Sequence, residues 1–524
     1  MIEEFSFRTR AQNLQKLKEQ NFDFLIIGGG ITGAAVAKEA SRRGFTVALV
    51  EKRDFAYGTS SRSSKLIHGG LRYLENFEFK LVFEALGERA WLLKKIPELV
   101  KPLAFFLPVY QSHPRNMKIL SLGLWLYDFL SLFRSYRFHK KISKERFLKE
   151  FPFLKQDGLL GGFTYYDALM WDDGLVVETL RQAHCLGACI ANYVEATSPI
   201  WQGERVVGFK VKDLEQTEGS EISIHANTVI SCVGPWTDEL GVHVSQTWKA
   251  ELNPSKGVHI VFDFKKIPAP GALIMSHPND GRVAFVIPRK DLGDGVVIVG
   301  TTDGPTPLDP EKATIEKQDI EYLLNLLEIY FPDLNLSVSD VISAYVGVRP
   351  LLTGTSGSEG QNLLQKVSRE HVIWRGQGGV VFVSGGKYTT HRKMAQEIIK
   401  VASKGCNVKP SRKKQNSITC HGIYSGLYTF TTKEESYMNL PFLKDKLREM
   451  ISGGMVLHLE DFYFRRLPLF LAQKDHGLSW VQDLGSVWGQ ELGVVSDKVS
   501  GEIDRLKKEI SAREYWRRGC SLEN

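Results

Sequence analysis

The sequence predicts an α/β fold in which a parallel sheet near the N-terminus is followed by a second β-rich region and a helical C-terminal region. The apolar strand Phe22–Ile27, the helix Ala34–Arg43 and the strand Thr46–Val50 form one βαβ unit of about 30 residues. Residues 252–302 alternate in a pattern typical of strands, and residues 417–524 are mostly helical in pattern. A chain of 524 residues is too long for one core, so we expect two or three domains.

The remaining elements follow from the same periodicities. Helical patterns predict helices at 80–100, 175–187 and 314–330. Alternating patterns predict strands within 188–232, at Val341–Tyr345 and at Val380–Val383.

Composition and charge exclude several classes of protein. Hydrophobic residues make up 43% of the chain, charged residues 24% and aromatic residues 11%, which excludes a disordered or coiled-coil chain. The net charge of +7 is too small to indicate binding to nucleic acid, but it suits an anionic substrate or lipid surface. Six cysteines without a CxxC pair, and an N-terminus without a secretory pattern, lead us to expect a cytoplasmic protein.

A glycine motif stands between the first strand and the first helix of the βαβ unit. In Gly28-x-Gly30-x-x-Gly33 the first glycine allows a tight turn, the second lets a pyrophosphate approach, and the third lets the helix pack on the strand. Glu51 ends the second strand, where its carboxylate can accept hydrogen bonds from both ribose hydroxyls of an adenosine. These features together predict a dinucleotide site, and the acid disfavours NADP.

The segment after Glu51 favours a cofactor longer than NAD. Residues 53–74 are rich in hydroxyl side chains, among them Thr59, Ser60 and Ser64, and Gly69-Gly70 offers exposed amides. Such a polar segment suits a cofactor that reaches well past its adenosine, as FAD does, whereas an NAD domain more often continues into another regular βα unit. The alternative is a serine-rich surface loop.

Six motifs carry a resemblance to a known family. GGGITGAAVAKEASRRG, EKRDFAYGTSSRSSKLIHGGLRYLE, VGPW, VGTTD, VGVRPL and SGGKYTTHRK resemble the respiratory, quinone-reducing FAD-dependent glycerol-3-phosphate dehydrogenases. The similarity runs from about residue 20 to 405 and is vaguer in the C-terminal helical region. It implies a Rossmann-type FAD-binding domain of the glycine-oxidase-like flavoproteins, an inserted β-sheet substrate domain and a helical C-terminal domain.

The resemblance also implies domain boundaries and a noncovalent FAD. The boundaries are an N-terminal extension at 1–20, a split FAD domain at 21–95, 155–245 and 366–405, a substrate domain at 96–154 and 246–365, and a C-terminal domain at 406–524. The expected FAD-binding residues are Gly28, Gly30, Ile31, Thr32, Gly33, Glu51, Lys52, Thr59, Ser60, Ser64, Lys65, Leu66, His68, Gly69, Gly70, Gly234, Trp236, Gly385, Gly386, Lys387 and Thr389. A histidine in a comparable motif carries the flavin covalently in some related amine oxidases, but here we expect His68 only to pack and hydrogen-bond around FAD.

Glycerol 3-phosphate, the substrate that the resemblance implies, is a small dianion that needs fixed cations. Guanidinium groups suit phosphate because they donate two parallel hydrogen bonds and stay charged. By resemblance, the substrate-binding residues are Arg72, Tyr73, Arg349, Arg369 and Lys387, with Arg349 and Arg369 directed to the phosphate. Without the motifs, any one of these arginines is more simply a surface or salt-bridge residue.

The catalytic residues expected by resemblance are His259, Arg349 and Lys387. Oxidation at C2 requires a base for the hydroxyl proton, and a neutral imidazole such as His259, in the strand motif GVHIVF, suits that role. Arg349 and Lys387 are alternatives that stabilise an alkoxide directly and make a dedicated base less critical. His259 can also be read as a buried structural histidine.

One segment bears on the membrane. Residues 119–133 are apolar except for Asp128 and are followed by a basic stretch at 134–149. An apolar helix that leads into a cationic segment can lie in a membrane interface, although a core helix with a charged flank is the simpler interpretation. No apolar run is long enough to span a bilayer. With the resemblance, we expect a peripheral protein of the cytoplasmic membrane that contacts anionic lipid, a membrane quinone and, in a homodimer, a second copy.

Other readings remain open. His184, Cys185 and Cys189 lack a fourth ligand at a sensible spacing, so we expect no metal site. The same fold and substrate also fit a glycerol-3-phosphate oxidase that uses oxygen, although the extra insertion of the family's soluble oxidases is not found here. More distant alternatives are a glycine-oxidase-like amine oxidase and a non-catalytic flavin-binding assembly factor.

Overall fold

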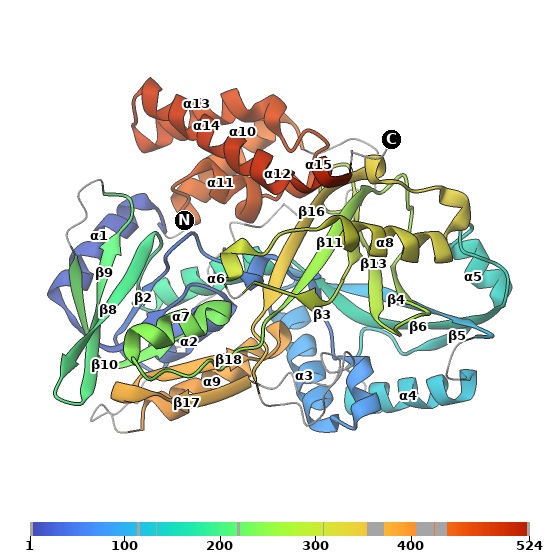
Figure 1. Ribbon diagram of the computed structural model, residues 1–524, viewed down its shortest axis with the longest axis horizontal. Coiled ribbons are helices and arrows are strands. Elements are labelled where there is room, and N and C mark those ends of the chain that lie inside the picture. Colours follow the sequence, from blue (N-terminus) through green and yellow to red (C-terminus); the bar gives the residue numbers. More distant parts are fainter. Residues whose placement is uncertain are drawn as a thin grey trace.

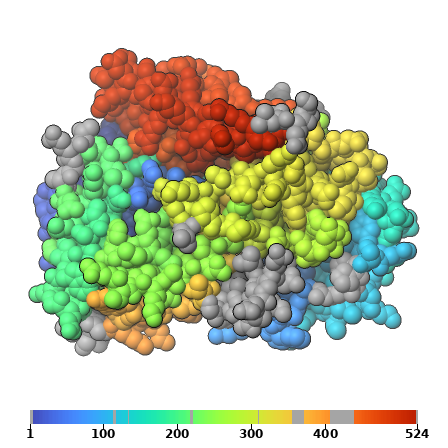
Figure 2. Space-filling view, viewed as in Figure 1, coloured from blue at the N-terminus to red at the C-terminus, as the bar shows by residue number. Residues whose placement is uncertain are grey.

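The computed structural model describes residues 4–112, 116–132, 134–216, 221–307, 309–353, 371–404, 424 and 438–520. Within them the chain forms two large sheets side by side, with a group of C-terminal helices placed over both (Figure 1). In the space-filling view those helices extend along one edge of the molecule, next to segments of both sheets (Figure 2).

The first sheet is mostly parallel. Its strands are β1 (Asn21–Ile27), β2 (Val47–Val50), β7 (Cys189–Ala191), β8 (Val194–Gln202), β9 (Arg205–Asp213), β10 (Ile222–Ser231), β17 (His371–Arg375) and β18 (Val381–Gly385). The order β18-β10-β1-β2-β7 is parallel throughout, whereas β17 and β9 add antiparallel neighbours. β1 and β2 are buried almost throughout because helices and loops cover both faces, as is usual for parallel sheets.

The second sheet is mostly antiparallel. Its strands are β3 (Leu66–Ile67), β4 (Val100–Tyr110), β5 (Lys140–Ile142), β6 (Leu159–Met170), β11 (Ser255–Asp263), β12 (Ala272–Ser276), β13 (Val283–Arg289), β14 (Val296–Gly300), β15 (Gly304–Pro305) and β16 (Val341–Arg349). The strand β11 lies between β14 and β16, so its side chains occupy the middle of this part of the sheet.

Helices cover the sheets and form the C-terminal region. Those that precede residue 405 are α1 (Phe7–Glu19), α2 (Ile31–Arg42), α3 (Phe79–Lys95), α4 (Met117–Leu130), α5 (Lys144–Glu150), α6 (Asp172–Cys185), α7 (Thr237–Val244), α8 (Lys317–Tyr330) and α9 (His391–Ala402). The C-terminal helices are α10 (Leu440–Gly453), α11 (Leu459–Asp461), α12 (Leu469–Ala472), α13 (Val481–Leu492), α14 (Ser496–Arg513) and α15 (Trp516–Cys520). The expected helical C-terminal region is therefore observed over 438–520.

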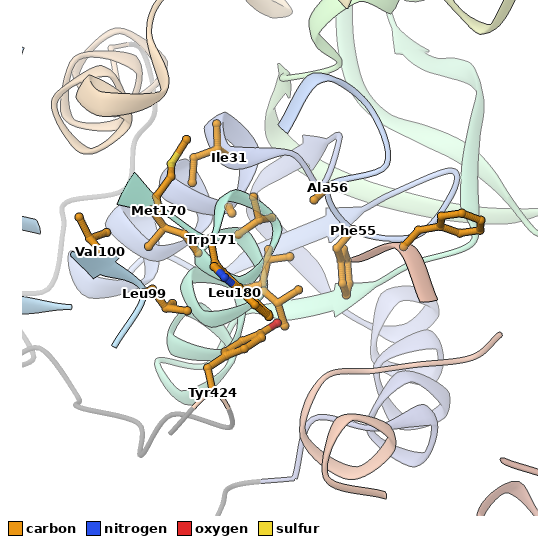
Figure 3. Packing of buried hydrophobic residues seen from close by; sticks show 14 of the residues in the cluster. Ile31, Phe55, Ala56, Leu99, Val100, Met170, Trp171, Leu180 and Tyr424 are labelled. Atoms are coloured by element: carbon orange, nitrogen blue, oxygen red, sulfur yellow. The ribbon is translucent and has the colours of Figure 1, made fainter. Parts of the chain in front are cut away.

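One hydrophobic core joins the first sheet, its helices and the C-terminal region. Figure 3 shows Phe55 after β2, Leu180 of α6 and Tyr424 within the same cluster, around the buried Trp171. The indole nitrogen of Trp171 donates to the Asp291 carboxylate (2.9 Å), so the polar edge of this large side chain is satisfied inside the core.

The observed contacts bear on two of the expected segments. Residues 155–245 were expected in the first domain, but β6 pairs antiparallel with β4 along its whole length and so belongs to the second sheet. The following helix α6 packs on α2, so the chain crosses between the sheets at Trp171–Asp172. The N-terminal extension packs on the rest of the protein, since α1 buries Leu14 and Leu17 and its Arg10 forms an ion pair with Asp213 (2.5 Å).

The helix of the apolar segment, α4, is not a core helix. In α4 the side chains of Ile119, Leu122, Trp125 and Phe129 are exposed, Leu122 by 71%, whereas one narrow face that includes Leu124 is buried. A helix that is apolar on nearly every side gives no sequence signal of which face the protein covers. Among the described residues, no helix combines the length and hydropathy needed to cross a bilayer.

Candidate active site

A long cavity follows the carboxyl ends of the parallel strands and reaches the middle of the second sheet. Its walls come from the turns after β1, β10 and β18, from the segment 57–68, and from side chains of β11 and β16. Ligands of open α/β sheets bind at this edge because the connecting turns there present backbone amides and helix N-termini.

The part of the cavity built by the Gly28–Gly33 turn, here called the glycine-loop part, depends on close backbone contacts. Gly28 has φ +109°, and a Cβ there would lie 2.6 Å from the Cys232 carbonyl oxygen. A Cβ at Gly33 would lie 1.9 Å from the carbonyl oxygen of Gly28, so the third glycine lets α2 pack on the turn. Gly30, the N-cap of α2, has no side chain that could cap the helix, so apart from the Ile31 amide, which donates to Ser60, the first helical turn leaves amides for a ligand on the cavity side.

Glu51 closes the glycine-loop part. Its carboxylate accepts hydrogen bonds from the amides of Gly29 (2.6 Å) and Arg53 (2.8 Å), so it fixes the glycine turn to the end of β2. Burial raises the pKa of the Glu51 carboxyl, and the Arg53 and Gly29 amides only partly offset this effect. Beside it Lys52 forms an ion pair with Glu195 (3.1 Å).

The segment 59–65 connects the two sheets. The Thr59 hydroxyl donates to the Val348 carbonyl of β16 (2.6 Å), and the α2 amide of Ile31 donates to the Ser60 hydroxyl (3.0 Å). Lys65 turns away from the cavity, where its ammonium pairs with Asp172 (2.6 Å). The segment is thus held at several points and is not a loose surface loop.

His259, Ser64 and Arg349 form what we call the histidine part of the cavity. His259 lies on β11 and is only 3% exposed; its Nε2 is 2.9 Å from the Ser64 hydroxyl, and its ring stacks on Tyr345 with centroids 4.7 Å apart. Burial, and then the charges of Arg349 and Lys65, lower the pKa of His259 to about 3. The imidazole is therefore neutral near pH 7.

Arg349, at the end of β16, is held in place by several acceptors. Its guanidinium donates to the Asp303 carboxylate (3.1 Å), to the Thr301 hydroxyl (3.1 Å) and to the Ser255 hydroxyl (3.2 Å). A Cβ on Gly257 would lie 2.3 Å from this guanidinium, so glycine is needed at that point of β11. The cation is thus fixed in the cavity wall before any ligand arrives.

A second cation lies on an aromatic ring. The ammonium of Lys387 is 3.4 Å from the centroid of the Tyr73 ring, a cation–π contact at the cavity wall. Lys387 follows Gly385 and Gly386, which have φ +74° and +88° and allow the chain to turn at the end of β18. The structure therefore brings together Tyr73 and Lys387, which are 314 positions apart in the sequence.

Most of the expected site residues line this one cavity. Those that do are Gly28, Gly30, Ile31, Thr32, Glu51, Lys52, Thr59, Ser60, Ser64, Leu66, His68, Tyr73, Gly234, Trp236, His259, Arg349, Gly385, Gly386, Lys387 and Thr389. Five lie outside its lining: Gly33, Lys65, Gly69, Gly70 and Arg72. Arg369 lies outside the described residues.

The five residues outside the lining have other surroundings. Gly33 packs against Gly28, Lys65 pairs with Asp172, and the Gly69 amide donates to the Tyr127 hydroxyl (2.9 Å). The side chain of Arg72 is exposed, and Gly70 with φ +77° gives room to the Tyr73 ring. The expected contacts of these five residues with cofactor or substrate therefore stay predictions.

The sequence reasoning missed several wall residues, of which Arg62 is the most informative. It lines the cavity with its guanidinium 5.1 Å from the centroid of the Tyr57 ring, and burial followed by the charge of Arg513 lowers the pKa of Arg62 to about 10. The sequence could have indicated this residue, because Arg62 is the one charged residue among the hydroxyl residues of TSSRSS. The wall formed by Val194, Ala196, Leu240 and His243 carried no such signal.

Comparison with known proteins agrees with this architecture. The family model described as FAD dependent oxidoreductase matches residues 23–392, so the chain belongs to the FAD-dependent oxidoreductases. It is 38% identical over 393 residues to the aerobic glycerol-3-phosphate dehydrogenase of Staphylococcus haemolyticus, covering 74% of this chain and 68% of that one. It is 36% identical to the alpha-glycerophosphate oxidase of Streptococcus pyogenes serotype M6, covering 76% and 73%.

Solved structures share the fold. The FAD complex of the glycerol-3-phosphate dehydrogenase from Bacillus halodurans aligns with a TM-score of 0.74 at 24% identity, covering 96% of this chain and 97% of that one. The glycine oxidase of Geobacillus kaustophilus aligns with a TM-score of 0.51 at 18% identity, covering 73% and 95%. The expected fold class is therefore confirmed.

The residues present fit FAD. The N-terminus of α2, which starts at a glycine N-cap, suits a pyrophosphate, the Glu51 carboxylate at the end of β2 suits a ribose, and the cavity continues past them to the histidine part. When bound, FAD supplies the hydride acceptor of an oxidoreductase.

Proposed function

We propose that this protein oxidises glycerol 3-phosphate to dihydroxyacetone phosphate by transfer of the C2 hydride to FAD. The observation that carries the proposal is a neutral, buried His259 in the same cavity as two cations, Arg349 and Lys387. A neutral imidazole takes the hydroxyl proton, and fixed cations favour both a phosphate dianion and the negative charge that grows on the C2 oxygen. The names of the relatives, at 36–38% identity, support the same substrate.

The side chains divide the work as follows. The amides of the glycine-loop part and Glu51 hold and orient the cofactor, and the neutral His259 accepts the C2 hydroxyl proton. Arg349, held by Asp303, and Lys387, held over Tyr73, supply positive charge without having to reorganise during the reaction. Arg72 and Arg369 remain proposed substrate-binding residues by resemblance.

Anaerobic reduction of the purified yellow protein tests this function. Glycerol 3-phosphate is expected to bleach the flavin absorbance, whereas glycerol, glycine and sarcosine leave it unchanged. Bleaching by glycine or sarcosine would favour an amine oxidase, and bleaching by none of the four would contradict the proposal.

We further propose a membrane quinone as the electron acceptor, with docking through an apolar patch. The proposed patch draws on the exposed apolar side chains of two helices that pack on each other (Figure 1): Ile119, Leu122, Trp125 and Phe129 of α4, and Phe79 and Phe83 of α3 with Phe77 just before it. Phe77 is 77% exposed and Leu122 is 71% exposed. Several large apolar side chains that are exposed in the same region indicate an interaction surface, whereas a single one would need no explanation. Exposed cations near it in sequence are Lys80, Lys118, Arg134, Arg137, Lys140 and Lys141.

Sedimentation with anionic liposomes tests the docking. The protein is expected to bind at low salt and to keep part of this binding at high salt, because apolar insertion is not screened. Replacing Leu122 and Trp125 by serine should abolish the salt-resistant part, whereas replacing Val495 and Tyr515, which are also well exposed, should not. Recovery entirely in the supernatant, with rapid peroxide formation from glycerol 3-phosphate, would favour an oxygen-using oxidase.

The proposed homodimer is tested separately, by size-exclusion chromatography.

A further inference from the structure

The carboxylate of Asp54, shortly after Glu51 in the sequence, is buried against the C-terminal helices. Arg466 donates hydrogen bonds to both of its oxygens (2.8 and 2.9 Å), and the Nε of Arg465 donates to one of them (2.5 Å). Asp54 and Arg466 are each 0% exposed, and they stand 412 positions apart in the sequence. A bidentate contact fixes both the position and the orientation of the carboxylate, and therefore the backbone that carries it.

The ion pairs around Asp54 are charged and are shielded from solvent. Burial alone would raise the pKa of the Asp54 carboxyl, but the charges and hydrogen bonds of Arg466 and Arg465 hold that pKa below its usual value. Both arginines lie in the π-helical turn Phe462–Arg466 between α11 and α12, a rare conformation that often occurs at functional sites. Because breaking a buried ion pair is strongly destabilising, this contact ties the C-terminal helices firmly to the segment around Asp54.

The segment 51–58, here called the wall segment, contributes to the glycine-loop part of the cavity. Its cavity-lining residues are Glu51, Lys52, Arg53, Tyr57 and Gly58. Between them Phe55 and Ala56, both labelled in Figure 3, hold the glycine turn. The Ala56 amide donates to the Gly29 carbonyl (3.2 Å), and a Cβ on Gly29 would lie 2.8 Å from the Phe55 ring. Since Glu51 accepts from the Gly29 amide, the wall segment bonds to both backbone polar groups of this glycine.

The wall segment contains one residue in an unfavourable conformation. Ala56 has φ +63°, in the left-handed region that residues with a side chain rarely adopt. Such a conformation persists where the surrounding contacts fix it, and it is commonest at binding and active sites. The ion pairs of Asp54 with the C-terminal helices supply one fixed point beside Ala56, and the Gly29 carbonyl supplies another.

A second contact connects the same C-terminal turn to the cavity wall. Arg465 also pairs with Asp461 (2.9 Å), and the Asp461 carboxylate accepts a hydrogen bond from the Tyr193 hydroxyl (2.5 Å). Tyr193 precedes Val194, a cavity-lining residue whose amide donates to the Glu51 carbonyl (2.7 Å). The C-terminal helices therefore contact two neighbouring segments of the cavity wall, the wall segment and the chain just before β8.

We propose that the C-terminal helices determine how tightly FAD is held, with Arg465 and Arg466 as positioning residues that act through Asp54. Neither arginine is among the residues that line the cavity, so both act by keeping Glu51 and the glycine turn in place before the cofactor binds. Because coupling between two sites is reciprocal, bound FAD in turn stabilises the attachment of the C-terminal helices. The proposal goes beyond the oxidation of glycerol 3-phosphate, since it holds whichever substrate reduces the flavin.

Release of FAD from the purified yellow protein measures this coupling without turnover. The holoprotein is diluted in steps, and the free FAD, separated by ultrafiltration, gives the Kd. Arg466→Met should raise the Kd about tenfold, because the wall segment loses its bidentate contact while Glu51 itself remains. Arg466→Lys keeps the charge but not the bidentate geometry and should recover part of the affinity. A wild-type Kd in folded Arg466→Met would overturn the proposal.

Arg289→Met is the matched control. Arg289 of β13 forms a buried ion pair of the same kind, with two hydrogen bonds of 2.9 Å to the Asp291 carboxylate, but it belongs to the second sheet. This variant should lower the Tm, as Arg466→Met does, and leave the Kd for FAD unchanged. An equal rise of the Kd in both variants would show that FAD is lost through general destabilisation, and the proposal would be wrong.

Combination with Glu51→Ala shows whether the effect passes through the wall segment. Arg466→Met should raise the Kd of Glu51→Ala by much less than it raises that of the wild type, because both substitutions act on the same contacts. Full additivity of the two effects would contradict the proposal.

Tyr193→Phe covers the case in which Arg466→Met does not fold. It removes only the hydroxyl that bonds to Asp461, so it should raise the Kd by a smaller factor. An unchanged Kd in Tyr193→Phe would count against the role of the C-terminal turn.

Failure of this proposal is distinguishable from failure of the proposed function, because FAD release requires no substrate. If glycerol 3-phosphate leaves the flavin oxidised but Arg466→Met releases FAD, the proposed function fails and the role of the C-terminal helices stands. If glycerol 3-phosphate bleaches the flavin and FAD release is unchanged in the variants, the proposed function stands and the role of the C-terminal helices is wrong.

Discussion

The glycine-loop part and the histidine part of the cavity are built in opposite ways. The first uses backbone groups from one short stretch, where Gly28, Gly30, Gly33 and Glu51 fall within 24 residues. The second brings together side chains from distant segments, among them Ser64, His259 and Arg349. A cofactor site made of backbone amides can therefore be predicted from a local sequence motif. A site made of side-chain contacts depends on how the two sheets are placed against each other.

The charges differ in the same way. In the glycine-loop part the carboxylate of Glu51 accepts from two amides and fixes the local turn. In the histidine part Arg349 and Lys65 are each paired with a carboxylate, and burial together with these two charges keeps the His259 imidazole neutral. The glycine-loop part is proposed to bind the cofactor, and the histidine part is proposed to hold the proton acceptor. Substitutions in the first should therefore change flavin affinity, and substitutions in the second should change the rate of flavin reduction.

The largest effect is expected for His259→Asn. Removal of the proton acceptor should slow flavin reduction by glycerol 3-phosphate about 10²- to 10⁴-fold, the usual contribution of general base catalysis. The flavin content should not change, because His259 belongs to the histidine part. A variant that is reduced at the wild-type rate would show that Arg349 and Lys387 suffice without a base.

A smaller effect, on the other part of the cavity, is expected for Glu51→Ala. The variant loses a carboxylate that holds the glycine turn and is proposed to hold the ribose, so FAD affinity should fall about ten- to a hundredfold. Glu51→Gln, which keeps one acceptor oxygen, should lose less. Full flavin occupancy of Glu51→Ala after dialysis would contradict this assignment.

The smallest effect on flavin reduction is expected where the C-terminal helices attach to the first sheet, since a substitution there should change stability instead. Burial alone would lower the pKa of His458, but hydrogen bonds to the Glu215 and Glu502 carboxylates raise it to about 10, with Asp461 adding to the effect. Arg505, which also contacts the ring, opposes the charge. Because the folded pKa is raised, the stabilisation is complete below about pH 6.5 and is lost as the pH rises toward 10, on the order of a few kcal/mol.

Thermal unfolding between pH 6.5 and 10 measures this term. The wild-type Tm should fall over that range, and His458→Gln should start lower and fall less. Equal slopes for the two proteins would show that His458 is not the group that titrates. Flavin reduction by substrate should be unaffected at neutral pH, since His458 lies outside the cavity lining.

Much of the fold and part of the site could be predicted from the sequence. Compact apolar runs located β1 and β2, helical patterns located α2 and α8 to within a few residues, and the glycine motif located the cavity. The resemblance supplied His259, Arg349 and Lys387, which line that cavity. It did not supply their partners, because a contact such as Ser64 with His259 is set by the tertiary fold.

Other features were beyond local patterns for definite physical reasons. The strand β6 joins the second sheet through its pairing with β4, which sequence proximity to α6 conceals. The lysine in SSKLIHGG looks like a ligand, but Lys65 is 3% exposed and neutralises Asp172. The exposure of the apolar helix α4 depends on which neighbouring elements pack against it. The composition of the helix does not determine which of its faces they cover.

The central claim, that this cavity oxidises the C2 alcohol of glycerol 3-phosphate, is tested most directly by single-turnover reduction with substrate deuterated at C2. The account predicts complete anaerobic bleaching of the flavin, one dihydroxyacetone phosphate formed per flavin, and a slower reduction with the deuterated substrate. Absence of bleaching, or bleaching that yields no dihydroxyacetone phosphate, would contradict it.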